Sequence, residues 1–395
     1  MQQLSLILTV ILAIALTPSQ WSLGISKIYG VYGQLSPTKN APYRRFVPAF
    51  YIFGDSTADS GNNNELSTIA RANFPPYGRD FDSRHASGRF SNGKMTSDWI
   101  NSFLSLPLVP AYLSREARMF PFQGANFASA GAGILNNTGD VLGEKLSNWQ
   151  QIELFLERRN ELVARIGVVA ASRHLRNSIL YIATGGNDYI HNWITNDTDA
   201  ALLPNDQFNA LLLTTLRDQL QVLYNAGARK AAVLGIGPVG CAPHFLWQTN
   251  STTGNCLEAV NGYVSQFNDG LREMLVQFNQ RNRGVHFVYR DIFDVVYRMA
   301  KFPFNFGFTN GNTACCGVGN FGGGDRCLSP MMVCANPLFN VFWDEYHPSH
   351  RANNFIAKQL WSGVDPSTTT RNSTSTAVYS FLTIQQLAAL QLTED

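Results

Sequence analysis

The amino-acid sequence predicts an α/β fold in which helices cover both faces of a mostly parallel sheet of about five strands. Five short apolar runs, rich in aromatic and β-branched residues, have the length expected of buried strands. Longer segments with apolar residues at three- and four-residue steps separate them, as expected of helices that pack one face against a core. Because this alternation forms βαβ units and no Pro- or Gly-rich linker interrupts it, we expect one domain.

The expected strands each begin or end next to a glycine or proline, where a turn can start. In chain order they are residues 46–54, 124–129, 178–186, 230–238 and 284–290. The expected helices, identified by their apolar periodicity, are residues 96–104, 147–175, 207–228 and 257–282. Near the C-terminus, residues 366–376 have the composition of a polar surface loop, and residues 383–392 fit a short closing helix.

Composition and charge are those of an ordered globular protein. Of the 395 residues, 45% are hydrophobic and 15% charged, which is enough apolar side chain for a sizeable core. The 30 basic and 28 acidic side chains nearly balance. The charge therefore gives no reason to expect nucleic acid or an anionic membrane surface as a partner.

The N-terminal region has the features of a secretory signal. Its apolar run, residues 4–16, is too short for a membrane span, which takes about 20 residues, but suits the core of a signal peptide. We therefore expect a signal peptide over residues 1–34, where position 34 is approximate. Residues 35–395 would then be a single secreted domain, extracellular or in the cell wall, with no stable membrane span. Four N-glycosylation acceptor sites agree with secretion: Asn136, Asn196, Asn250 and Asn372.

Six cysteines, an even number within Gly-rich loops, predict three disulfides in a secreted chain. Cys241 and Cys256 are the natural local pair. Three pairings are open to the remaining four, which are Cys315, Cys316, Cys327 and Cys334. We expect a bridge between the two adjacent cysteines to be disfavoured by disulfide geometry. A zinc site is the rival interpretation, but no histidine lies at zinc-ligand spacing beside these cysteines, so we expect no metal.

Polar residues follow three of the expected strands, and a fourth group lies far downstream. Ser56 follows the first strand, the glycine-rich run SAGAG (129–133) the second, and Asn187 the third. Asp344 precedes His347 by three residues near the C-terminal end of the chain. Because the carboxyl ends of parallel strands share one edge of a sheet, we expect all four groups to converge.

Together these residues would supply every part that acyl transfer needs. Ser56 offers the attacking hydroxyl, His347 the base that takes its proton, and Asp344 an acceptor for the other imidazole N–H. The Asn187 amide, the Ser56 backbone N–H and a glycine N–H could stabilise an oxyanion. Each feature alone has an ordinary explanation as a turn, a packing glycine, a loop hydrogen bond or half a metal site. The hypothesis therefore rests on all of them occurring together.

Six segments of the chain, taken in order, resemble the motif blocks of one family: FGDSTADSGNNN, GRFSNGKMTSDWI, NFASAGAGIL, ATGGNDY, GIGPVGCAP and FWDEYHPSHRA. The chain resembles a plant-type GDSL esterase/lipase of the SGNH hydrolase superfamily, from about Val47 nearly to the C-terminus. The resemblance implies a three-layer α/β/α sandwich of flavodoxin-like type and no metal or organic cofactor. It matches Ser56 to the nucleophile, Asp344 and His347 to the rest of the triad, and Asn187 to the oxyanion side chain.

Three positions within this resemblance need separate treatment. For the oxyanion glycine we favour Gly133, with Gly131 as the alternative, because the run SAGAG leaves the register ambiguous. Thr57 stands where the family has a leucine, which we expect to change local packing without loss of activity. His350 stands where an acidic residue is common, and it could alter the loop that carries His347 or titrate beside it.

The predicted function is that of a secreted serine ester hydrolase that forms an acyl-enzyme with a small-molecule or polymer-attached ester. Two alternatives stay open. One is an extracellular acyltransferase with the same site, for example one that carries out cutin-type hydroxyacyl transfer. The other is a non-catalytic glycoprotein that binds carbohydrate or protein. The sequence predicts neither the natural ester nor the oligomeric state.

Overall fold

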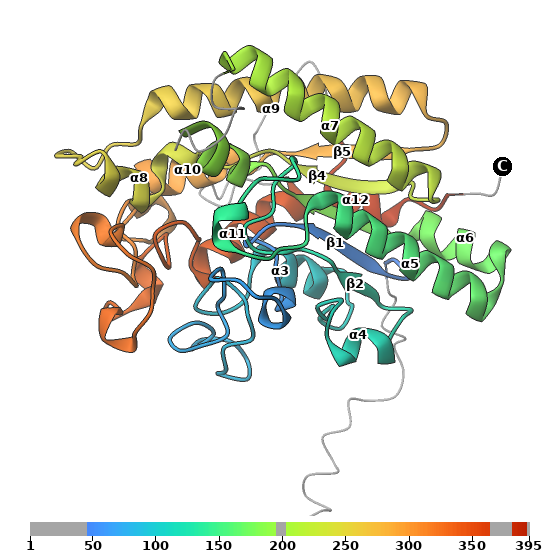
Figure 1. Cartoon of the computed structure of the whole chain (residues 1–395), viewed down its shortest axis with the longest axis horizontal. Coiled ribbons are helices and arrows are strands. Elements are labelled where there is room, and N and C mark those ends of the chain that lie inside the picture. The colour runs from blue at the N-terminus through green and yellow to red at the C-terminus, as the bar shows by residue number, and fades with distance from the viewer. Residues whose placement is uncertain (1–45, 195–202, 364–380, 393–395) are drawn as a thin grey trace, which may run out of the picture. The chain divides into compact units, whose positions relative to one another are not determined.

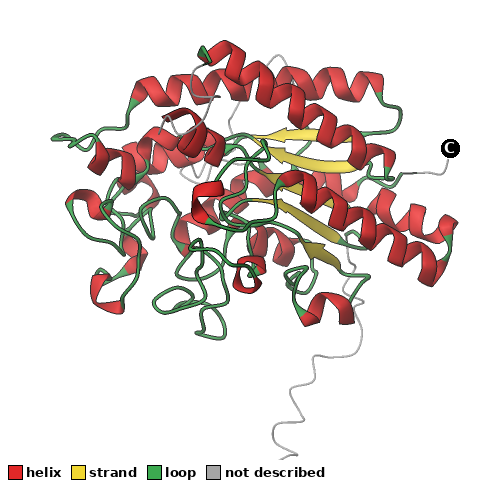
Figure 2. Cartoon of the chain, in the orientation of Figure 1, coloured by secondary structure: helices red, strands yellow, loops and turns green. Residues whose placement is uncertain are grey.

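The computed structural model describes residues 46–194, 203–363 and 381–392. In this part of the chain a five-stranded sheet lies between two layers of helices (Figure 1). All neighbouring strands are parallel (Figure 2), in the order β2-β1-β3-β4-β5. The strands are β1 (Phe50–Gly54), β2 (Gly124–Asn126), β3 (Ile179–Ala183), β4 (Lys230–Leu234) and β5 (His286–Arg290). The α/β prediction and its flavodoxin-like strand order are confirmed.

Every strand lies within its predicted run but is shorter. The pairing of β1 with β3 ends at Gly54 and Ala183, where both backbones turn into loops. Gly54 has φ +147°, and a Cβ atom there would lie 2.1 Å from the carbonyl oxygen of Ala183. Only glycine allows the two backbones to approach this closely. Gly54 is thus the last residue of β1, and the polar residues that follow it lie in the loop.

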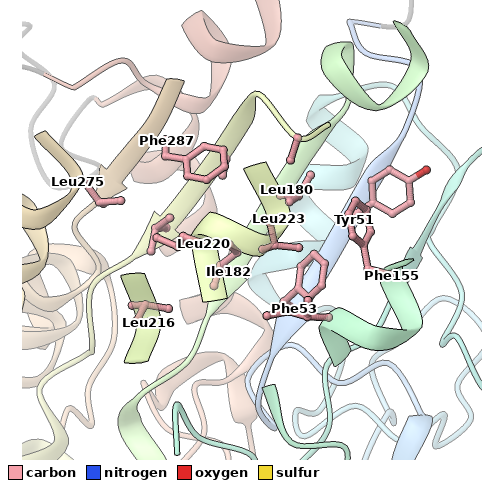
Figure 3. Close-up of a cluster of buried hydrophobic side chains, with 14 of the residues drawn as sticks. Tyr51, Phe53, Phe155, Leu180, Ile182, Leu216, Leu220, Leu223, Leu275 and Phe287 are labelled. Carbon is pink, nitrogen blue, oxygen red and sulfur yellow. The ribbon is translucent and has the colours of Figure 1, made fainter. Parts of the chain in front are cut away.

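Alternate residues along each strand point to opposite helix layers, so the sheet has two cores. On one face, Tyr51, Phe53, Leu180, Ile182 and Phe287 are buried against helices (Figure 3). The helices of this layer are α5 (Asn148–Ile166), α6 (Val168–Asn177), α7 (Asn205–Asn225) and α9 (Glu258–Arg281). Apolar strands buried on both faces are typical of parallel sheets, which explains why the strand runs lack polar alternation.

The opposite face of the sheet packs against a second layer. Phe50, Ile52, Tyr181, Leu234 and Val288 belong to its core. The helices of this layer are α3 (Thr96–Phe103), α10 (Phe293–Lys301), α11 (His350–Ser362) and α12 (Ile384–Ala389). Helix α12 confirms the expected closing helix. Two further short helices, α4 (Arg115–Met119) and α8 (Pro243–Gln248), belong to neither of these two cores.

The predicted helix over 147–175 is two helices. Gly167 ends α5 and begins α6 with φ +79°, a conformation that side chains other than glycine rarely adopt. Helices α10 and α11 were not predicted as separate elements. The predicted signal peptide (1–34) and the predicted polar loop (366–376) lie outside the described residues.

Three disulfides staple the loops that follow β4 and α10. They join Cys241 to Cys256, Cys315 to Cys334, and Cys316 to Cys327. The local pair is the predicted one, and the two adjacent cysteines are not bridged to each other. Cross-links of this kind hold irregular segments that have little core of their own.

Candidate active site

The strand order creates a crevice at the carboxyl ends of β1 and β3. Strand β1 has β2 on one side and β3 on the other, so the order of the sheet reverses there. In open α/β sheets, ligands bind outside the carboxyl ends of the strands at such a switch point. Ser56 follows β1 and Asn187 follows β3, so the topology brings these two residues to the crevice.

Ser56 lies in a tight turn that is anchored on both sides. The N–H groups of Ala58 and Asp59 donate to the carbonyl of Asp55 at 3.1 and 2.9 Å. The Gln151 side chain of α5 accepts from the N–H of Gly54 at 2.9 Å and donates to its carbonyl at 2.8 Å. The serine is therefore held by the end of a buried strand and by a helix behind it.

The asparagines after Ser56 are buried and join the first motif to the second. The amide of Asn62 donates to the carbonyls of Asn126 and Ala128, at 2.9 and 2.8 Å. Asn63 donates to the carbonyls of Ala70 and Ala130, at 2.9 and 3.0 Å. Their polarity thus satisfies backbone groups inside the fold. This network fixes the segment after β2 relative to the serine turn.

The structure separates the two candidate glycines of the second motif. Gly131 has φ +86° and lines the cavity that contains Ser56. Gly133 packs elsewhere, since a Cβ atom at this position would lie 2.4 Å from Asp188 Oδ2. The cavity lining includes Gly131 and not Gly133, which favours the alternative glycine, Gly131, as the proposed oxyanion donor.

Asn187 and Asp188 have different tasks. Asn187 lines the cavity, and its amide donates to the carbonyl of Ala132 at 2.9 Å, which leaves a second amide hydrogen. Asp188 is buried and accepts from the N–H of Ile134 at 2.7 Å and from the Thr138 hydroxyl at 2.7 Å. The aspartate therefore joins the loop after β3 to the second motif and orients its neighbour toward the cavity.

Ser56, His347 and Asp344 form a continuous chain of hydrogen bonds. His347 Nε2 lies 2.8 Å from Ser56 Oγ. His347 Nδ1 lies 2.7 Å from Asp344 Oδ1 and 2.9 Å from its Oδ2. These distances are within the range for direct proton transfer between serine and imidazole. The sequence analysis predicts that these three side chains converge, and in the structure they are in hydrogen-bond contact.

Asp344 is held by more groups than the imidazole. Its Oδ1 accepts from the backbone N–H groups of Tyr346 at 3.0 Å and His347 at 2.7 Å. Its Oδ2 accepts from the hydroxyl of Tyr77 at 2.8 Å. Phe90 packs against the other side of the His347 ring, with ring centres 5.0 Å apart. The carboxylate and the ring are therefore both fixed in orientation.

Replacing Tyr77 with phenylalanine will lower kcat by about tenfold or more, the effect of losing one hydrogen bond to a charged group. Asp344 would keep its backbone donors but lose the hydroxyl that fixes Oδ2. Tyr112→Phe is a matched control, because its hydroxyl also donates to a carboxylate, that of Glu157, on a helix away from the site. Equal kcat values for Tyr77→Phe and wild type would show that Tyr77 does not position the carboxylate.

Burial and charge set the protonation of the site. Burial alone would lower the pKa of His347, but the Asp344 carboxylate outweighs it, so the pKa lies above its ordinary value. Burial likewise opposes ionisation of Asp344. The neighbouring imidazolium and three hydrogen bonds outweigh it, and the pKa of this carboxyl lies below its ordinary value. Asp344 thus stays charged at neutral pH and favours the protonated form of the ring.

A cavity of about 440 Å³ contains Ser56, Gly131, Asn187 and His347 in its lining. Its other walls are mostly aliphatic and come from several elements: Ile69, Leu142, Ile190, Ile236, Val239, Ile292, Val296 and Ile356. An apolar cavity with a few polar groups at one point is typical of a small-molecule site. This volume and lining suit a ligand that carries an aliphatic group.

The segment between α10 and α11 forms part of the cavity wall. The disulfide Cys316–Cys327 closes a loop whose residues Gly324, Asp325 and Arg326 line the cavity. Arg326 Nη1 donates to the carbonyl of Ile69 at 2.6 Å, which joins this loop to the one after Ser56.

The two departures from the family pattern have structural roles. The Thr57 hydroxyl donates to Asp55 Oδ1 at 2.7 Å, a bond that leucine could not make. His350 Nδ1 accepts from the backbone N–H of Lys94 at 2.7 Å, and its ring packs on Trp99. Burial holds the pKa of His350 below its ordinary value, so the ring is a neutral acceptor that fixes the start of α11.

Several features outside the cavity were also predicted. Asn136 and Asn250 are exposed, as a glycosylation site requires, whereas Asn196 and Asn372 lie outside the described residues. Within the described ranges, no group of three or more His, Cys, Asp or Glu side chains could hold a metal ion. No helix in the same ranges is long and apolar enough to cross a membrane.

Comparisons with known proteins agree with this geometry. The sequence model of the family described as GDSL-like Lipase/Acylhydrolase matches residues 50–360. Two Arabidopsis thaliana proteins named as GDSL esterase/lipase are each 39% identical, over 317 and 321 residues; each alignment covers 80% of this chain, and 88% and 87% of theirs. The Arabidopsis protein GDSL esterase/lipase 7 is 38% identical over 327 residues, which is 81% of this chain and 89% of its own.

Proposed function

The chain belongs to the GDSL-like lipase/acylhydrolase family and is an ester hydrolase; we propose that it is a secreted serine esterase that works through a Ser56–His347–Asp344 triad and an acyl-enzyme. One observation carries this proposal. The imidazole of His347 lies between the Ser56 hydroxyl, at 2.8 Å, and the Asp344 carboxylate, at 2.7 Å. The arrangement gives the weak serine nucleophile the base that it needs.

In the first half of the reaction, Ser56 Oγ attacks the ester carbonyl carbon while its proton passes to His347 Nε2. The carbonyl oxygen becomes an oxyanion, for which the N–H groups of Ser56 and Gly131 and the Asn187 amide are the proposed donors. When the tetrahedral intermediate collapses, the bond to the alcohol oxygen breaks and Nε2 returns its proton to that oxygen. The alcohol leaves, and the acyl group stays on Ser56 Oγ.

Water completes the cycle by the same steps. His347 Nε2 takes a proton from water as the water oxygen attacks the acyl-enzyme, and then returns the proton to Ser56 Oγ as the carboxylic acid leaves. Throughout, Asp344 holds Nδ1–H and stabilises the transient imidazolium. Each proton is thus returned, and the net reaction is ester plus water to acid plus alcohol.

The disulfides and exposed glycosylation acceptors support the proposed secretion. Three cross-links use all six cysteines, which is typical of chains that fold in an oxidising compartment. Asn136 and Asn250 are both accessible to an attached glycan.

Labelling with a fluorophosphonate tests the nucleophile directly. The probe should phosphonylate Ser56 in the folded protein with loss of fluoride, and the adduct should map to the peptide that contains Ser56 by mass spectrometry. Heat-denatured protein and the Ser56→Ala variant should both stay unlabelled. Folded wild-type protein without an adduct at Ser56 would contradict the proposed mechanism, since an activated serine reacts with this class of probe.

A further inference from the structure

Glu345 is a buried carboxyl group in the cavity wall that the triad does not use. Its side chain is only 6% exposed and lies in the lining of the cavity. The oxygen Oε2 is fully buried and has no hydrogen-bond partner among the residues that the structure describes. A buried carboxyl oxygen without a partner makes the charged form of the side chain costly, which favours the protonated acid.

The backbone around Glu345 is fixed on the side away from the triad. The carbonyl of Glu345 accepts from the backbone N–H of His244 at 3.0 Å. The His244 ring packs on Tyr346 with ring centres 4.8 Å apart, and its Nδ1 lies 3.2 Å from the carbonyl of Gly323. Glu345 therefore belongs to a part of the cavity wall in which α8, the loop closed by Cys316–Cys327 and the turn that carries the triad contact one another.

The chemical state of Glu345 suits hydrogen-bond donation. Burial, followed by the nearby charge of Asp344, raises the pKa of Glu345 to about 8. Arg326 lies near enough to lower this pKa, but it forms no salt bridge with Glu345 in the described part of the chain, and its Nη1 donates to Ile69 instead. At neutral pH the side chain is thus a carboxylic acid, which can both donate and accept.

Glu345 lies close to His347, the residue that must protonate the leaving alcohol oxygen of an ester. The proposed reaction requires the leaving oxygen to come within reach of His347 Nε2, which protonates it. Glu345 belongs to the same tight turn as His347, between Asp344 and the imidazole, and both side chains line the cavity. A hydroxyl group on the alcohol carbon next to this oxygen would therefore lie in the part of the cavity that Glu345 and His347 share.

The rest of the cavity has a different character. Leu234, Ile292, Val296 and Ile356 line it and belong to β4, α10 and α11 or their edges, on the second face of the sheet. These side chains offer no hydrogen bond and pack on apolar groups such as an acyl chain. The cavity thus has an apolar wall suited to an acyl chain and a polar wall at Glu345.

We propose that Glu345 is a substrate-binding residue, which hydrogen-bonds a hydroxyl group on the alcohol part of the ester and makes the enzyme prefer esters of polyols, such as glycerol or sugars, over simple alkyl esters. This inference rests on the proposed function. It assigns the aliphatic acyl group to the apolar wall and the hydroxylated alcohol to the wall that contains Glu345.

The proposal is tested with two esters that have the same acyl group and differ in their alcohol part. The value of kcat/KM is measured at pH 7 for glyceryl monobutyrate and for ethyl butyrate, and their ratio is divided by the same ratio for hydroxide-catalysed hydrolysis. The value of kcat/KM reports acylation, in which both esters transfer the same butyryl group to Ser56 with the same base. An effect of Glu345 on His347 would therefore change both rates alike, and only a contact with the alcohol part changes the ratio.

The wild-type ratio should exceed one, and Glu345→Met should lower it about tenfold, the effect of losing one hydrogen bond to the substrate. Glu345→Gln should keep the ratio within about threefold of wild type, because its amide can still donate. Glu273→Met, at an exposed position on α9, is the matched control and should leave the ratio unchanged.

A wild-type ratio near one, or an unchanged ratio in Glu345→Met, would overturn the inference. The first of these outcomes needs only wild-type protein, so the inference stays testable even if the methionine variant does not fold. Failure of the proposed function has a separate signature, because Ser56→Ala would then still hydrolyse both esters.

Discussion

Replacing Ser56 with alanine will lower kcat for short-chain aryl esters by about 10⁴-fold or more, because no other group can accept the acyl chain. Residual turnover would come only from the oxyanion donors and from substrate binding. The variant should fold, since Ser56 is partly exposed and its hydroxyl contacts only His347 among the interactions described. Hydrolysis of a chromogenic ester, measured together with thermal unfolding, separates lost chemistry from lost stability.

Ser60→Ala is the matched control for this experiment. Ser60 lies in the same loop, is buried, and its hydroxyl has no hydrogen-bond partner among the described residues. Its removal should leave kcat within about twofold of wild type, as expected of a change that breaks no bond. If Ser56→Ala keeps wild-type turnover while its melting temperature is unchanged, the nucleophile must be sought elsewhere.

The sequence was sufficient to predict the sheet and to single out the side chains that we propose to react, because both depend on short-range patterns. The strands are apolar runs long enough to be read, and Ser56 and Asn187 follow them directly. His347 and Asp344 are close in sequence, so their pairing does not depend on the rest of the fold. What the sequence could not supply was the distance between Ser56 and His347, since 291 residues separate them.

The residues that the sequence did not reveal act through long-range contacts. Tyr77 lies in a loop without a periodic pattern, and its bond to Asp344 spans 267 residues. Glu345 belongs to the motif FWDEYHPSHRA. Its surroundings come from α8 and from the loop closed by Cys316–Cys327, and both are distant from it in sequence. The two glycines of SAGAG are equivalent as letters, and only backbone geometry separates Gly131, which faces the cavity, from Gly133.

The pH dependence of the wild-type enzyme follows from the charges around His347. The ring must be neutral to accept the proton of Ser56, and its pKa lies above the ordinary value of 6.5. As the pH falls, kcat/KM should therefore begin to decline earlier than an isolated histidine would suggest. Among the buried carboxyls near the ring, Asp344 raises this pKa most, and Asp55 adds to it.

Replacing Asp344 with asparagine should lower kcat by about 10³- to 10⁴-fold and move the acid limb of kcat/KM to lower pH. The first effect arises because the amide cannot stabilise the imidazolium and can hold the ring in the wrong tautomer. The second has a definite sign. The carboxylate that raises the pKa of His347 is gone, while burial, which lowers it, remains.

The pH profile separates this electrostatic role from a structural one. Asp294→Asn is the matched control: Asp294 is exposed on α10 and pairs with Arg298, so it should change neither kcat nor the midpoint of the acid limb. If Asp344→Asn only reduced the fraction of folded enzyme, kcat/KM would be lower at every pH, but the pH at the midpoint of its acid limb would stay the same. An acid limb that stays at the wild-type pH in a folded Asp344→Asn enzyme would mean that Asp344 does not set the pKa of the base. An acid limb that moves to lower pH in this variant would show that the Asp344 carboxylate raises the pKa of His347.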